Sequence, residues 1–78
     1  MENIIYRGVY LDATDSPDGE TPHCYIVTKE INGYAIWHQT SDATMIYQFG
    51  PWLPRDEAIE TAVSITQKAR AENNYTKL

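Results

Sequence analysis

The sequence is poor in cysteine and has no long hydrophobic run. Its single cysteine, Cys24, excludes an internal disulfide and is typical of a reducing compartment. No apolar stretch approaches the roughly 20 residues of a membrane span. Residues 1–5 lack both the basic segment and the apolar stretch of a signal peptide. We therefore expect a cytoplasmic protein that does not enter a membrane.

Basic side chains are also few, and they are dispersed along the chain. Six Lys and Arg stand against 11 Asp and Glu, which gives a net charge of -5 at pH 7. Nucleic-acid binding needs clustered basic groups that neutralise phosphates, so we expect no direct binding of nucleic acid. A basic partner surface would complement this charge, although a charge of this size is also ordinary for solubility.

What the chain does have is a high share of apolar and tyrosine residues in a short length. Its 78 residues, 42% of them hydrophobic, predict one small folded domain over residues 1–78. A chain this short buries only about 60–65% of its unfolded surface. Oligomerisation would therefore add to its stability.

Runs of β-branched and aromatic residues predict four strands, at about 4–11, 23–31, 34–40 and 45–49. The dipeptide Asn32-Gly33 predicts a two-residue hairpin turn, which would place Ile31 opposite Tyr34. A second polar turn over residues 41–44 leads into the last strand, where we expect His38 opposite Tyr47 and Ile36 opposite Phe49.

A helix is predicted over about 54–72, after the break at Gly50-Pro51. Pro54 suits the first helical position, and acidic residues in the first turn complement the helix dipole. An apolar stripe at helical spacing would bury Ala58, Ile59, Ala62, Val63, Thr66 and Ala69. The expected fold class is α+β: an antiparallel β-meander of three to four strands with one C-terminal helix packed on one face.

Three stretches carry a resemblance to known proteins. They are residues 25–27, the run Gly33-Tyr34-Ala35-Ile36, and residues 54–59 with Ala62. This pattern resembles uncharacterised small bacterial proteins of three strands and a helix. In those proteins a G-aromatic-A-V hairpin strand precedes a helix that opens x-x-E-A-I-x-x-A. The resemblance implies the fold and carries over no functional residue.

An acidic loop is predicted between the first two strands. Asp, Ser, Pro, Gly and Thr crowd residues 12–22, and residues 16–19 have the composition of a tight turn. Calcium loops place acids at alternate positions, whereas Asp12, Asp15 and Asp18 are spaced by three. We therefore expect a solvated, mobile loop without a bound ion.

His23, Cys24 and His38 are the candidate metal ligands. The predicted register pairs His38 with Val27 and puts His23 about 13 Å away, while Cys24 points to the opposite face. Zinc needs ligands within about 2.0–2.3 Å of one point, so we expect no metal site. The sequence also has no nucleophile elbow and no glycine-rich phosphate loop. We expect no catalytic residue, no cofactor and no enzyme activity.

Alternation along the strands predicts two unequal sheet faces. The face with Tyr25, Val27, Ile36, Tyr47 and Phe49 is richer in apolar bulk and should face the helix. The opposite face would leave an accessible patch that we predict to be an interface: Ile26, Trp37, Gln39, Ile46 and Gln48.

This patch predicts a protein-binding module, most simply one that self-associates as a homodimer. The alternative is a small acidic inhibitor of the phage or prophage kind. Such a protein would occupy the nucleic-acid-binding surface of a target protein, and the interaction would weaken as the salt concentration rises.

Overall fold

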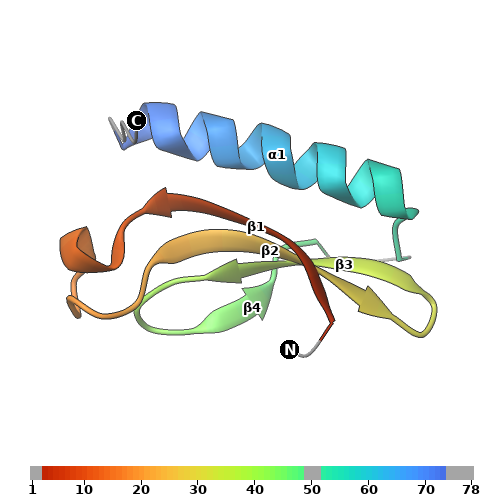
Figure 1. Cartoon of the computed structure of the whole chain (residues 1–78), viewed down its shortest axis with the longest axis horizontal. Coiled ribbons are helices and arrows are strands. Elements are labelled where there is room, and N and C mark those ends of the chain that lie inside the picture. The colour runs from red at the N-terminus through yellow and green to blue at the C-terminus, as the bar shows by residue number, and fades with distance from the viewer. Residues whose placement is uncertain (1–2, 49–51, 74–78) are drawn as a thin grey trace.

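The fold is a four-stranded antiparallel sheet with one helix lying across one face (Figure 1). The computed structural model of the chain describes residues 3–48 and 52–73. Along the chain the elements are β1 (Ile4–Leu11), the short 3-10 helix η1 (Ala13–Asp15), β2 (His23–Glu30), β3 (Gly33–Gln39), β4 (Thr44–Ile46) and α1 (Arg55–Glu72). Neighbouring strands in the sheet follow chain order, so the predicted α+β meander with a C-terminal helix is confirmed.

The β2–β3 hairpin turns one residue earlier than the sequence predicts. Glu30 pairs with Gly33, so the turn residues are Ile31 and Asn32. Gly33 is instead needed for close packing: a Cβ there would lie 2.6 Å from Trp52 Cβ, and its φ is +146°. The shift changes every strand partner but leaves each side chain on its predicted face, because strand side chains alternate with a period of two.

The pairing of β3 with β4 differs from the prediction in the same way. His38 lies opposite Met45, not Tyr47. The Tyr47 N–H donates a 2.7 Å hydrogen bond to the carbonyl of Ile36. The sequence predicted Phe49 opposite Ile36, and Phe49 lies outside the described part of the chain.

The helix packs closely on the sheet because small residues face the strands. Its buried positions are Ala58, Ala62, Thr66 and Ala69. A Cβ on Gly8 of β1 would lie 2.4 Å from Thr66 Oγ1, so the glycine permits this close approach. Ile59 and Val63, expected in the core, are only partly buried. The core centres on Val27 and Ile36, with Tyr6, Tyr25, Tyr34, Leu53 and Ile65 around it.

The ends of α1 are held by hydrogen bonds at Pro54 and Asn73. Pro54 is the N-cap rather than the first helical residue, and its carbonyl accepts the N–H of Ala58 at 2.9 Å. At the other end, the Asn73 side chain donates to the carbonyl of Ala69 at 2.8 Å. Within the described residues, no helix is long and apolar enough to cross a membrane.

The acidic loop is folded around one carboxylate. The predicted turn forms, because the Gly19 N–H donates to the carbonyl of Ser16 at 3.0 Å. Asp18 Oδ1 then accepts the backbone N–H groups of Glu20 and Thr21, each at 2.8 Å. These hydrogen bonds hold the pKa of Asp18 well below its ordinary value.

Candidate functional site

The strand register brings the predicted apolar interface residues together. Ile26, Trp37 and Ile46 lie side by side on β2, β3 and β4. The expectation that Ile26 is accessible is wrong, because this side chain is 0% exposed. Two long side chains flank it in register: Arg7 of β1 on one side and Trp37 on the other. Ile26 therefore offers no contact surface on the open face.

Trp37 is held in place by a hydrogen-bonded chain on this face. Its indole Nε1–H donates to Thr28 Oγ1 at 2.7 Å, and that hydroxyl donates to Glu30 Oε2 at 2.7 Å. Thr28 is buried, so its hydroxyl needs both partners. Trp37 thus has a structural role in addition to its partly exposed surface.

The two predicted glutamines behave differently. Gln39 is half-buried, and its amide Nε2–H donates to the carbonyl of Pro22 at 3.2 Å, which ties β3 to the end of the acidic loop. Gln48 is exposed. Of the predicted interface, Trp37, Ile46 and Gln48 therefore offer the most available contact surface.

The structure adds two accessible residues that sequence reasoning placed in the core. Met45 is 58% exposed and Tyr47 is 44% exposed, although both lie on the helix side of the sheet. A helix about 10–12 Å wide covers roughly two or three strands spaced about 4.8 Å apart, so one helix leaves a fourth strand bare. Here α1 packs on β1, β2 and β3. Comparing helix width with strand number would have identified both residues from the sequence.

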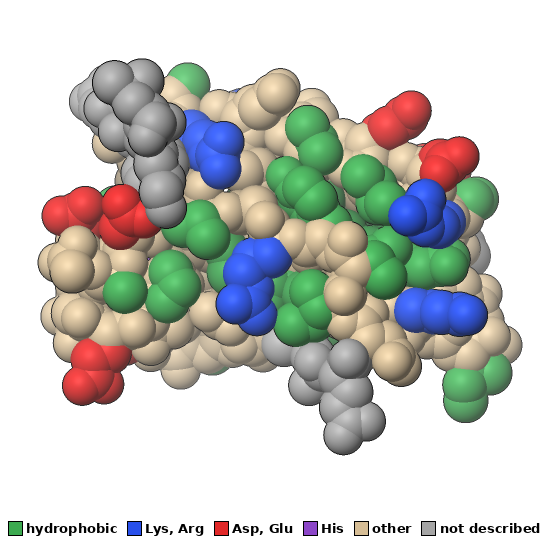
Figure 2. Space-filling view, viewed as in Figure 1, with side chains coloured by type: hydrophobic (Ala, Val, Ile, Leu, Met, Phe, Trp, Pro, Cys, Tyr) green, Lys and Arg blue, Asp and Glu red, His purple; other side chains and the backbone are tan. Residues whose placement is uncertain are grey.

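These side chains lie on the two sides of the sheet at its β4 edge, and the set is here called the β3–β4 surface: Trp37, Met45, Ile46, Tyr47 and Gln48. From residue 33 to residue 48 the sequence has a single charged side chain, Asp42, although the whole chain has 17. Figure 2 shows one face of the molecule, on which acidic groups lie toward the ends, and Lys and Arg side chains lie among the hydrophobic groups between them. Within the β3–β4 surface Met45, Tyr47 and Gln48 are exposed, Trp37 and Ile46 are partly buried, and none of the five side chains is charged.

Five rings pack together next to this surface, from Tyr10, His23, Tyr25, His38 and Tyr47. The rings of Tyr25 and His38 are stacked with centroids 4.5 Å apart, and Tyr47 meets Tyr25 edge-on at 5.3 Å. The Tyr10 hydroxyl and His38 Nε2 share a 2.7 Å hydrogen bond.

The two histidines are closer than the predicted register placed them. His38 lies opposite Tyr25, so His23 is two residues along β2 from that pair, not four. Both imidazoles contact the ring of Tyr10, with centroids 5.9 Å and 5.8 Å away. The Nε2 atom of each ring already has a partner, since His38 Nε2 shares the hydrogen bond with Tyr10 and His23 Nε2 accepts the backbone N–H of Ser41 at 3.2 Å. Among the described residues, no three metal-ligating side chains form a group that could hold a metal ion.

Burial controls the protonation of this cluster. It lowers the pKa of His38, an effect to which nearby His23 adds, so His38 is neutral at pH 7. Burial also raises the pKa values of the Tyr10 and Tyr25 hydroxyls. On the other face, burial raises the pKa of the Cys24 thiol, opposed by nearby Arg7. A protonated, buried thiol is a weak nucleophile.

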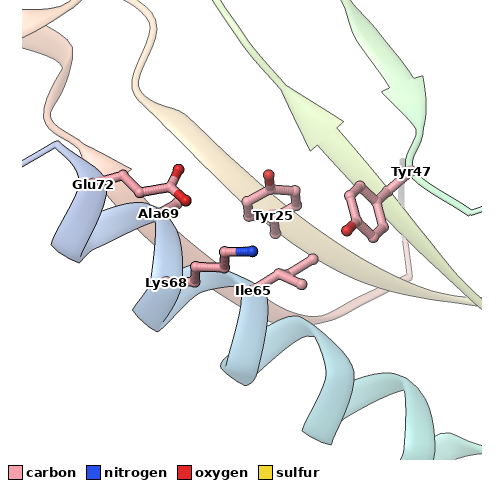
Figure 3. Close-up of a pocket in the computed structure, with 6 residues that line it drawn as sticks. All are labelled: Tyr25, Tyr47, Ile65, Lys68, Ala69 and Glu72. Atoms are coloured by element: carbon pink, nitrogen blue, oxygen red, sulfur yellow. The ribbon is translucent and has the colours of Figure 1, made fainter.

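A small cavity opens between the ring cluster and the C-terminal half of α1 (Figure 3). Its volume is about 200 Å³, below the roughly 300–1,000 Å³ of pockets that hold drug-sized ligands. Tyr25 and Tyr47 line the sheet side, and Ile65, Lys68, Ala69 and Glu72 line the helix side. The exposed Tyr47 therefore connects the ring cluster to the β3–β4 surface.

Comparisons of the chain with protein-family models, with curated proteins and with solved structures found no match.

Proposed function

We propose that the chain is a non-enzymatic protein-binding module that self-associates through the β3–β4 surface. The observation that carries this proposal is the coincidence of apolar exposure and missing charge. Met45, Ile46 and Tyr47 are consecutive and uncharged, Met45 and Tyr47 are exposed, and α1 packs mainly on β1, β2 and β3.

Self-association fits this surface better than a charged partner does. Each copy has a net charge of -5, so two copies repel one another unless their contact avoids the charged regions. The β3–β4 surface meets this condition, since none of its five side chains is charged. Aromatic residues and methionine are also enriched where proteins bind each other, and Trp37, Met45 and Tyr47 supply both types.

The contact differs from the predicted interface in its position. The predicted patch was centred on Ile26, which is buried, so the surface offered for contact moves toward β4. Trp37 and Ile46 remain in it from the open face, and Met45 and Tyr47 join it from the helix side.

Sedimentation of matched variants tests the proposal. We expect the wild type to self-associate at micromolar to millimolar concentration, and Met45→Glu to weaken association at least about tenfold, because it would bury an unpaired charge. Ile31→Glu is the matched control: Ile31 is 100% exposed at the hairpin turn, and its substitution adds the same charge far from β4 in the sheet. A wild type that stays monomeric, or two variants with equal effects, would contradict the proposal.

A second candidate is the small acidic inhibitor, which the exposed carboxylates of the acidic loop favour. Asp15, Asp18 and Glu20 are exposed, and hydrogen bonds to Asp18 hold the loop in one shape. The test is displacement of labelled duplex DNA from basic DNA-binding proteins, with Asp15→Asn/Glu20→Gln as the variant. Displacement that salt and this variant both abolish would support the inhibitor, whereas no displacement at low salt would exclude it for those targets.

A further inference from the structure

The outer edge of β4 carries backbone groups that face away from the sheet. The Tyr47 N–H points inward to the carbonyl of Ile36, and the carbonyl of Ala43 points inward to the N–H of Thr40. Because successive strand residues point their N–H and C=O groups in opposite directions, those of Thr44 and Ile46 point outward. No strand of the described chain lies beyond β4.

The opposite edge of the sheet is protected by comparison. On β1, the Arg70 Nε–H donates to the outward carbonyl of Val9 at 2.8 Å, so α1 covers part of that edge. The pairing of β1 with β2 also shifts register twice, between Ile4 and Tyr6 and between Val9 and Leu11. Irregular pairing and covering side chains are ways in which proteins block edge-to-edge contact.

β4 is short, at three residues, but its pairing with β3 is regular and no side chain of the described residues is seen to bond its outer edge. Residues 43–48 contain no charged residue and no proline, the residues that most often prevent an edge strand from pairing. A strand whose side chains are also apolar and uncharged would suit this edge. In a chain of charge -5, the β4 edge of a second copy meets both conditions.

We propose that two copies join their β4 strands edge to edge, antiparallel, about a two-fold axis at Ile46. This geometry rests on the proposed self-association and specifies how it occurs: one continuous sheet rather than two stacked faces. The outward N–H and C=O groups of Ile46 then form two hydrogen bonds with the C=O and N–H groups of Ile46 in the second copy.

The side chains agree with this register. With Ile46 on the axis, Met45 of one copy lies opposite Tyr47 of the other, twice. Both are accessible in the single chain, and a methionine sulfur against an aromatic ring is a favourable contact. The two helices lie on the same side of the joined sheet, each over its own β1, β2 and β3.

Amide hydrogen exchange followed by NMR at two concentrations tests the geometry. We expect the Ile46 amide to exchange at least about tenfold more slowly at about 1 mM than at about 10 µM, because its N–H is bonded only in the dimer. The Tyr47 amide, bonded to Ile36 within one chain, is the internal control and should change far less.

The outcomes separate this inference from the function on which it rests. Suppose that sedimentation shows a dimer but the exchange rate of the Ile46 amide does not depend on protein concentration. That result would overturn edge pairing and leave the proposed self-association standing. An absence of any dimer up to about 1 mM would overturn both, since weak interfaces have dissociation constants below that value.

A proline variant gives an independent test. Thr44→Pro removes an outward N–H that makes no bond to β3, so the single chain should keep its fold. We expect it to weaken association at least about tenfold and to abolish the concentration dependence at Ile46. A folded variant that dimerises like the wild type would contradict edge pairing; if the variant unfolds, the exchange result for the wild type decides.

Discussion

Trp37 Nε1 lies 2.7 Å from Thr28 Oγ1, and this hydrogen bond fixes the indole on the face of the sheet that α1 leaves open. The Thr28 hydroxyl in turn donates a hydrogen bond to Glu30 Oε2. The partly exposed Trp37 therefore serves the fold as well as any contact, and truncating it would change both. For that reason Met45, not Trp37, is the residue whose substitution tests association.

Thr28→Val tests the structural role of this hydrogen bond. The variant keeps the shape of the side chain but leaves the indole N–H without its acceptor, so we expect a loss of about 1–3 kcal/mol in the free energy of unfolding. Urea denaturation measures it. Thr14→Val, the same change at an exposed position, should cost under about 0.5 kcal/mol. Equal midpoints for the two variants would show that the bond does not stabilise the fold.

Gly8→Ala tests the close approach of α1 to β1. The new Cβ would lie 2.4 Å from Thr66 Oγ1, so the helix must move and we expect a cost of about 1–3 kcal/mol. In the double variant with Thr66→Ala the nearest clash is gone, and the two changes should cost at least about 1 kcal/mol less than their sum. Costs that simply add would mean that the two residues do not meet.

The pH dependence of stability follows from His38. Its pKa in the folded chain is lower than the ordinary 6.5, so the unfolded chain binds a proton more readily. The stabilisation from a neutral His38 is therefore complete above pH 6.5 and is lost as the pH falls through the folded pKa. Other groups facing this imidazole are Tyr10, Tyr25 and His23.

Chemical denaturation at about pH 7.5 and about pH 5 measures this effect. The wild type should lose more stability between the two values than His38→Phe, which keeps a ring against Tyr25 but cannot bind a proton. Carboxyl groups titrate equally in both proteins and cancel in the comparison. An identical loss in both would place the pH dependence elsewhere.

Local patterns were enough to predict the order of the elements and the face of the sheet that packs on the helix. The strand partners were not predictable, because Asn32-Gly33 is a strong turn signal that a tertiary contact overrides. Gly33 lies against Trp52, and Tyr34 exchanges backbone hydrogen bonds with Leu53 at 3.0 Å and 3.1 Å. These contacts join residues about twenty positions apart, beyond the reach of a turn rule.

The candidate site was predictable in part. Alternation placed Trp37 and Ile46 together correctly, but it treats each face as wholly covered or wholly open. Ile26 is buried on the open face because long neighbours flank it, and Met45 is exposed on the helix side because the helix does not reach β4. Both outcomes depend on side-chain length and helix width, which a two-face pattern leaves out.

Dilution of ¹⁵N-labelled protein, followed by two-dimensional NMR, tests most directly that the β3–β4 surface is where copies of this chain meet. Between about 1 mM and about 10 µM, amide shifts should change at residues 44–48 and at Trp37, and stay constant in the acidic loop and on the outer side of α1. Shifts that do not depend on concentration, or changes centred on residues 12–22, would contradict the account.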